Sequence, residues 1–249
     1  MSRSVHCRAI AVSLLLTLLP ATAEAAEIKV MYPPPMRTML AELIPQFERT
    51  SGHKLAVTYE SSWLLVERIR KGETPDVAFL TARQADDLIR KGKMARRVDV
   101  ASSSIGLAVR AGAPKPDIAT VEAFKRTLLA AKSFARNEGA DSGVFMSGLL
   151  DRLGLTDAMK PKTTLVRQGF VAELVAKGEV ELGAQQMPEL MAIAGVDAMP
   201  LPAEIQHTIV FCAALPTAPR SSAAVDELVR FLSSPTAVPV IKAKGLTPM

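Results

Sequence analysis

Two adjacent serines, Ser61 and Ser62, are the first residues of this sequence whose type and position point to a chemical role. They follow a strand-like segment at residues 55–59 and precede a short amphipathic helix that ends near residues 71–72. Hydroxyl groups and backbone N–H groups at the start of a helix can hold an anion without a metal. We therefore expect both serines to contact an anionic ligand. The alternative is that one of them only caps the helix.

A second polar group lies near the middle of the chain. Arg136 ends a predicted strand, and Asn137 opens a polar loop that leads to Ser142 and Gly143 at the start of the next helix. The N–H groups of that helix start could bind an anion, while Arg136 or Asn137 supplies a guanidinium or an amide. An ordinary solvated connection is the alternative interpretation.

Four further residues follow predicted strands and are candidates for ligand contact. Tyr32 ends the first strand of the chain and could form a wall of a cleft. Thr81 follows the apolar strand at residues 76–80. Gln185 and Gln186 end a later strand, where a neutral amide suits carboxylate or hydroxyl groups of an organic ligand. Because side chains alternate along a strand, only one of the two glutamines can face the cleft.

The sequence carries none of the common catalytic or metal-binding motifs. Beyond the first 26 residues it contains two histidines, His53 and His207, and no Cys or His cluster at metal-ligand spacing. We expect no metal and no cofactor. These observations favour a binding protein over an enzyme. A proton-transfer isomerase stays open, because it needs only a base and a clamp for the anion.

The N-terminus and the composition indicate an exported protein. Arg3 and Arg8 precede a short apolar run at residues 9–19, and small residues follow it, so residues 1–26 are predicted to be a cleavable signal peptide. We expect a soluble, monomeric, periplasmic protein, in which Cys212 has no internal disulfide partner. The net charge of +5 fits a small anionic ligand, whereas interspersed charges and 4% aromatic residues do not favour nucleic acid.

The elements that must position these residues alternate between short strands and amphipathic helices. This alternation, without hairpin signals, predicts an α/β protein with mostly parallel sheets flanked by helices. We expect two lobes, residues 27–103 with 210–249 and residues 104–209, connected by two crossover strands near residues 102–110 and 202–211. Ligands of such sheets bind at the carboxyl ends of the strands, so the cleft between the lobes is the expected site.

Four segments of the chain resemble the molybdate-type periplasmic solute-binding proteins of ATP-driven importers. These segments are the opening strand and helix at residues 28–52, the pair Ser61-Ser62, residues 71–80 and residues 177–183. The resemblance implies the two-lobed fold of type 2 periplasmic binding proteins and a membrane permease of an ABC importer as partner. The chain is also similar to periplasmic aconitate isomerase.

Together these observations predict a solute-binding protein. We expect it to capture a small anion, either an oxyanion such as molybdate or a small carboxylate, and to deliver it to an ABC transporter. The alternative is a periplasmic isomerase that acts on a dicarboxylate or tricarboxylate such as aconitate.

Overall fold

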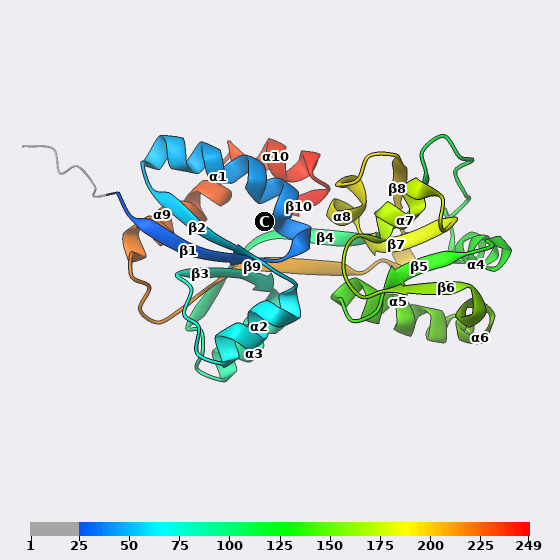
Figure 1. The fold of residues 1–249 in the computed structure, drawn as a ribbon, viewed down its shortest axis with the longest axis horizontal. Helices are drawn as coiled ribbons and strands as arrows, with labels where there is room; N and C mark the ends of the chain where they lie inside the picture. Colours follow the sequence, from blue (N-terminus) through cyan, green and yellow to red (C-terminus); the bar gives the residue numbers. More distant parts are fainter. Residues whose placement is uncertain (1–24) are drawn as a thin grey trace, which may run out of the picture.

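The computed structural model describes residues 25–249, so the predicted signal peptide lies outside this range except for its last two residues. Two groups of elements lie side by side and are joined by extended strands (Figure 1). The first group, here lobe 1, contains β1 (Glu27–Tyr32), the 3-10 helix η1 (Pro34–Met36), α1 (Arg37–Ser51), β2 (Lys54–Tyr59), α2 (Ser62–Arg70), β3 (Val77–Thr81), α3 (Ala82–Arg90), the first part of β4 (Arg96–Arg110), β9 (Thr208–Leu215), α9 (Ser222–Leu232), α10 (Ala237–Ala243) and β10 (Leu246–Pro248).

The second group, here lobe 2, is built from the middle of the chain. It contains the second part of β4, then α4 (Val121–Ala130), β5 (Phe134–Asn137), α5 (Asp141–Arg152), α6 (Thr156–Met159), the 3-10 helix η2 (Lys160–Lys162), β6 (Thr163–Val166), α7 (Val171–Lys177), β7 (Leu182–Gln186), α8 (Met187–Met191), β8 (Val196–Pro200) and the 3-10 helix η3 (Ala203–Ile205).

Strand β4 belongs to the sheets of both lobes. Residues 96–104 pair antiparallel with β9, and residues 105–110 pair antiparallel with β7 and β8. The strands lie in the order β2-β1-β3-β9-β4-β7-β5-β6, and β8 and β10 both pair with β4. The chain returns to lobe 1 between β8 and β9. We propose that the chain divides near these crossing strands into two lobes, residues 27–103 with 210–249 and residues 104–209.

The sheet of lobe 1 is covered by helices on both faces (Figure 1). Successive side chains of β1 point to opposite faces. Ile28 and Val30 therefore pack in the cluster that contains α1 and α9, whereas Met31 packs in the cluster that contains α2 and α3. Strand β3 is buried along its whole length because both of its faces are covered.

In lobe 2, the same arrangement brings helix starts to the carboxyl ends of strands. Ala135 of β5 packs in one cluster with Val171 and Val175 of α7. A Cβ at Gly183 of β7 would lie 2.6 Å from Cγ1 of Val171, so α7 lies directly on this strand. Helix α5 begins four residues after β5 and α8 begins directly after β7. Both helix starts therefore lie at the sheet edge where ligands bind in such folds.

The predicted alternation of strands and helices is confirmed, with two differences. The elements α6, α8, β8 and β10 were not predicted, because each spans five residues or fewer and lacks a clear hydrophobic period. Parallel pairing joins β1 with β2 and β3, and β5 with β6 and β7, but β4 and β9 pair antiparallel to their neighbours. The reason is that the two crossing strands carry the chain between the lobes in opposite directions.

Two further observations concern Cys212 and the helices of residues 25–249. Cys212 is buried and has no disulfide partner in this part of the chain, and its burial raises the pKa of the thiol to about 12. None of the helices within the same residues is both long and apolar enough to cross a membrane.

Candidate functional site

A cavity of about 240 Å³ lies between the two lobes. Lobe 1 contributes the starts of η1, α2 and α3, and lobe 2 contributes the start of α5, the end of β7 and the first turn of α8. We call it the interlobe cleft and define it by its lining residues, which are Pro34, Pro35, Ser61, Ser62, Trp63, Arg83, Gln84, Gly139, Ala140, Asp141, Val144, Arg167, Gln186 and Glu189.

The two serines of lobe 1 line this cleft. Ser61 is the N-cap residue of α2, but its side chain makes no capping hydrogen bond. Its backbone N–H donates to Oε1 of the neighbouring Glu60 at 3.0 Å. The hydroxyl groups of Ser61 and Ser62 and the first N–H groups of α2 are therefore available to a ligand in the cleft.

Gln186 and Glu189 form the buried part of the wall from lobe 2. Gln186 is 4% exposed and Glu189 is 6% exposed. Gln186 Oε1 and Glu189 Oε2 have no hydrogen-bond partner among the described residues. A buried polar atom without a partner is destabilising, which makes such atoms good markers of ligand sites. Gln186 is thus the glutamine of the pair that reaches the cleft.

Gln185 points away from the cleft and holds Glu189 in place. Its Oε1 accepts the backbone N–H of Val171 at 2.8 Å, and its Nε2 therefore donates to Glu189 Oε1, also at 2.8 Å. This hydrogen bond occupies one carboxyl oxygen and leaves Oε2 as the free one. We assign Gln185 a positioning role.

The environment of Glu189 changes its acidity. Burial raises the pKa of this carboxyl to about 8, while the hydrogen bond from Gln185 and the nearby backbone N–H of Gln186 act in the opposite direction. At neutral pH the group is mostly a neutral carboxylic acid, which can donate a hydrogen bond. Strongly perturbed carboxyls in clefts are typical of functional sites.

Three of the predicted residues lie together at the end of β5 and the start of α5, outside the lining of the cleft. A Cβ at Gly143 would lie 2.0 Å from the carbonyl oxygen of Asn137, so this helix start packs directly on the end of β5. Ser142 and Asn137 are buried, and Ser142 Oγ and Asn137 Oδ1 lack partners among the described residues. The N-cap Ala140 provides no side-chain bond, so the first N–H groups of α5 remain available.

Arg136 has a different position from the one that the sequence suggested. Its Nη1 donates to the carbonyl oxygens of Asn137 at 3.0 Å and Gly143 at 3.1 Å. The side chain lines a separate cavity of about 140 Å³ between α5, α6 and β6. These bonds tie Nη1 to the loop, whereas the buried Nε has no partner among the described residues. Arg136 therefore stabilises the loop from outside the interlobe cleft, and its contact with a ligand stays a prediction.

Tyr32 and Thr81 also lie outside the cleft lining. The Tyr32 ring is buried and lies 5.6 Å from the ring of Tyr59, centroid to centroid. Thr81 caps α3: its Oγ1 accepts the backbone N–H of Gln84 at 3.4 Å, while the Gln84 side chain accepts the Thr81 N–H at 3.2 Å. Both residues shape the elements that border the cleft.

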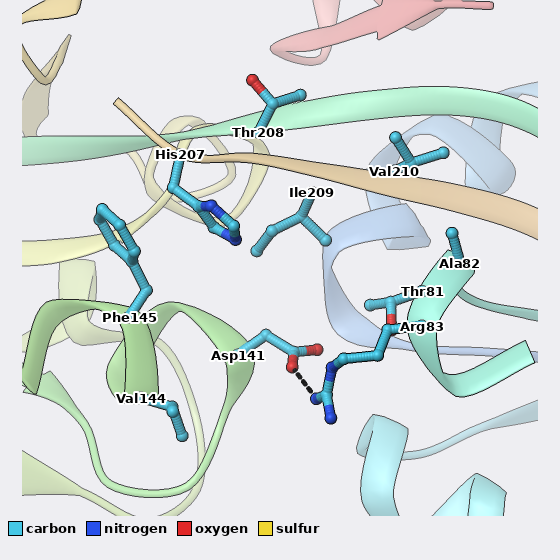
Figure 2. Close-up of a pocket in the computed structure, with 10 residues that line it drawn as sticks. All are labelled: Thr81, Ala82, Arg83, Asp141, Val144, Phe145, His207, Thr208, Ile209 and Val210. Atoms are coloured by element: carbon cyan, nitrogen blue, oxygen red, sulfur yellow. Dashed lines mark hydrogen bonds and ion pairs between the residues drawn. The ribbon is translucent and has the colours of Figure 1, made fainter. Parts of the chain in front are cut away.

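A second, larger cavity of about 520 Å³ lies beside the crossing strand β9, and we call it the hinge-side cavity (Figure 2). Its walls include Thr81, Ile209 and Val210, together with Phe145, whose ring stacks on His207 at 4.7 Å. Lining residues are Thr81, Ala82, Arg83, Asp141, Val144, Phe145, His207, Thr208, Ile209 and Val210.

Among the described residues, one ion pair joins the two lobes. Arg83 Nη2 of α3 lies 2.7 Å from Asp141 Oδ1 of α5, and Figure 2 shows the two side chains meeting across the gap. Both residues line the interlobe cleft and the hinge-side cavity, so the pair lies between these two spaces. Such a pair favours a closed arrangement of the lobes, by an amount limited by its exposure to water.

Sequence reasoning missed Glu189. The signal available was weak: Pro188 in the first turn after a strand marks a helix start, which places the next residue near the carboxyl edge of the sheet. The described residues contain no group of three or more His, Cys, Asp or Glu arranged to hold a metal ion. The cleft presents hydroxyl, amide, carboxyl and guanidinium side chains together with N–H groups of helix starts, a set that suits an anion held by hydrogen bonds.

Comparison with known proteins agrees with this fold. Residues 28–247 match the family described as bacterial extracellular solute-binding protein. The chain is 34% identical over 219 residues to an aconitate isomerase from a Pseudomonas species, covering 84% of this chain and 83% of the relative. It is 28% identical over 239 residues to the molybdate-binding protein ModA of Azotobacter vinelandii, covering 92% of each.

A solved structure shows the same architecture. The periplasmic molybdate-binding protein of Azotobacter vinelandii superimposes with a TM-score of 0.72 at 21% identity, covering 88% of this chain and 98% of that one. The fold is therefore that of the type 2 periplasmic binding proteins. The chain belongs to the family of bacterial extracellular solute-binding proteins.

Proposed function

We propose that this protein captures a small anion in the interlobe cleft and delivers it, in the periplasm, to the permease of an ABC importer. The observation that supports this most is the pair of unpartnered buried atoms, Gln186 Oε1 and Glu189 Oε2, in a cleft that Ser61 and Ser62 border from the other lobe. Family membership and the similarity to a molybdate-binding protein agree with it.

The physical basis of binding is closure around the ligand. When the lobes meet, water leaves the cleft, and hydrogen bonds from neutral donors to a charged ligand become stronger in the less polar surroundings. The starts of α2 and α5 contribute N–H groups that favour negative charge. The Arg83–Asp141 pair adds a contact that exists only when the lobes are close.

A thermal-shift screen of the purified protein tests this proposal. The ligands are molybdate, tungstate, sulfate, citrate and aconitate; a ligand present at one hundred times its dissociation constant adds about 2.7 kcal/mol to the free energy of unfolding. We expect at least one anion to stabilise the protein, and Ser61→Ala with Ser62→Ala to weaken its affinity about tenfold. No stabilisation by any of these anions would overturn the proposal.

Ser222→Ala is the matched control for the serine variants. Ser222 is the first residue of α9, as Ser62 is of α2, but it lies outside the interlobe cleft. We expect this control to bind as the unmodified protein does.

The partner and the assembly state are parts of the same proposal. A signal peptide at residues 1–26 would export the chain, and the mature protein would act as a monomer that presents both lobes to a permease. Cell fractionation and light scattering of the ligand-bound protein test these two points. Retention in the cytoplasm, or a stable dimer, would contradict them.

An isomerase that acts on a dicarboxylate or tricarboxylate is the second candidate. It is favoured by the 34% identity to an aconitate isomerase and by a carboxyl in the cleft whose pKa is about 8, because such a group can both accept and return a proton near neutral pH. In this reaction Glu189 would remove a proton from one carbon and return it to another as the double bond moves, with no net change in atoms. Chromatography of cis- and trans-aconitate after incubation decides it, and conversion equal to the buffer blank would exclude it.

A further inference from the structure

The carboxyl of Glu189 has two oxygens in different situations. Oε1 accepts the Nε2–H of Gln185 at 2.8 Å, whereas Oε2 has no partner among the described residues. The amide of Gln185 cannot be reversed without losing its bond to the backbone N–H of Val171. Because Oε1 already accepts a hydrogen bond, the proton of the neutral acid resides on Oε2.

We propose that the protonated Glu189 is the ligand-contacting acid of lobe 2, donating its Oε2–H to an ionised oxygen of a small organic carboxylate. This assignment rests on the proposed anion-binding function and names its ligand class. An O–H donor to an ionised oxygen forms a short, strong hydrogen bond in surroundings that exclude water. The ligand enters the cleft as the anion, and the protein supplies the shared proton.

The size and lining of the cleft favour an organic ligand over a tetrahedral oxyanion. Its volume of about 240 Å³ is many times the roughly 10–15 Å³ that a cavity needs to hold one water molecule. The lining includes Pro34, Pro35 and Val144, as well as Trp63, whose exposed fraction is 60%. These apolar groups can contact the carbon chain of an organic ligand, and an inorganic oxyanion has no carbon chain.

The charged groups around Glu189 leave the neutral acid as its stable form at neutral pH. Helix α8 packs on β4, β7, β8, α7 and η1. Neither β7 nor η1 carries an ionisable side chain. Within residues 25–249, no ion pair or side-chain hydrogen bond joins Glu189 to an ionisable group of the other three elements. Those ionisable groups are Arg96, Arg97, Asp99 and Arg110 of β4, Asp197 of β8, and Glu173 and Lys177 of α7.

Groups from lobe 1 and from the cleft rim complete the electrostatic surroundings. Tyr59 is close enough for the Glu189 charge to raise its pKa, although burial is the larger cause and Arg37 opposes both. Arg37 lies over the Tyr59 ring at 5.6 Å and over Phe170 of lobe 2 at 6.0 Å. Other charges in the cleft lining are already paired: Arg83 with Asp141, and Arg167 with Glu138.

Calorimetric titration from pH 7 to 9.5 tests the proposal. The probes are tricarballylate, which is a saturated tricarboxylate with no double bond to move, succinate and molybdate. We expect a carboxylate to bind more tightly than molybdate at pH 7, and its affinity to fall about thirtyfold by pH 9.5. This factor follows from tenfold per pH unit above the Glu189 pKa of about 8.

Two substitutions of Glu189 distinguish loss of the titrating proton from loss of the hydrogen-bond donor. Glu189→Gln keeps an acceptor for Gln185 and places an N–H donor toward the cleft, so we expect affinity within about threefold of the unmodified protein at pH 7 and no fall up to pH 9.5. Glu189→Leu has no donor, and we expect at least tenfold weaker binding at pH 7. Glu179→Gln, an exposed carboxyl outside the cleft, should keep the original pH profile.

Each contrary outcome has a distinct meaning. Carboxylate binding that does not change from pH 7 to 9.5, or full affinity in Glu189→Leu, would overturn the role of Glu189 while leaving the proposed function intact. Binding of molybdate but of neither carboxylate would overturn the ligand class. If the unmodified protein binds none of the three probes nor the anions of the thermal-shift screen, the proposed function itself fails.

Discussion

Replacing Glu189 with glutamine should stabilise the ligand-free protein at pH 9 and change its stability little at pH 5. The pKa of this carboxyl is raised from 4.5 to about 8 in the folded protein, because burial disfavours the ionised form. Below pH 4.5 both the folded and the unfolded chain carry the proton. Between pH 4.5 and about 8 the unfolded chain loses it and the folded chain keeps it, so stability falls as the pH rises through this window. The glutamine variant does not titrate and keeps its stability.

The magnitude follows from the size of the shift. A shift of about 3.5 pH units at about 1.4 kcal/mol per unit gives an upper value of about 5 kcal/mol. Water that reaches the carboxylate when the lobes separate stabilises its charge. We therefore expect the free energies of unfolding of the unmodified protein and Glu189→Gln to differ by about 2–4 kcal/mol at pH 9. For a protein of this size that corresponds to roughly 5–10 °C in Tm.

Thermal denaturation followed by circular dichroism at pH 5, 7 and 9 measures this difference. Glu179→Gln provides the control for removing an exposed carboxyl from the same lobe, and its Tm should follow that of the unmodified protein at each pH. Equal Tm values for the unmodified protein and Glu189→Gln at pH 9 would refute the reasoning, as would a difference that grows toward pH 5.

Three other substitutions test the elements around the cleft. Gly143→Ala should destabilise the protein by about 3 kcal/mol or more in urea denaturation, because its Cβ would lie 2.0 Å from the Asn137 carbonyl oxygen. Arg83→Gln should weaken ligand affinity two- to fivefold by calorimetry, because it removes the exposed ion pair with Asp141 that favours closure. Asp76→Asn should cost about 2–3 kcal/mol at pH 7 by urea denaturation, because the buried carboxylate accepts N–H groups of Lys29 and Arg220.

Each of these variants has a matched control. Gly148→Ala adds the same methyl group to α5 where the nearest atom lies at 3.9 Å, so it should not destabilise. Arg90→Gln removes the same charge from α3 but only a pair within that helix, so affinity should not change. Asp226→Asn breaks an exposed pair with Arg96 and should cost less than 1 kcal/mol. If a control lowers stability or ligand affinity as much as the variant that it matches, the structural explanation of that variant is wrong.

Much of the site could be predicted because it follows one rule of the fold. Ligands meet α/β sheets at the carboxyl ends of strands, and Ser61, Ser62 and Gln186 all follow strand ends. The period of two along β7 further required that Gln185 and Gln186 face opposite ways. Both statements depend on local sequence and chain direction alone.

The rest depends on contacts between distant segments, which local patterns do not encode. The sequence places Arg136 at a strand end, where its guanidinium could contact an anionic ligand. In the structure, two backbone carbonyls beside it accept its Nη1 hydrogens. The sequence predicts no helix around Glu189, which is buried where α8 packs between its own sheet and η1 of lobe 1. Its free oxygen exists only because Val171, from another helix, fixes the amide of Gln185.

The proton that Glu189 donates also couples ligand binding to pH. With a pKa of about 8, the carboxyl of the ligand-free protein is mostly protonated at pH 7 and mostly ionised at pH 9. Because only the protonated form donates a hydrogen bond to the ligand, binding at pH 9 should take up close to one proton, whereas binding at pH 7 should take up almost none. Titrations in buffers of different ionisation enthalpy should measure this difference, and equal proton uptake at the two pH values would refute the coupling.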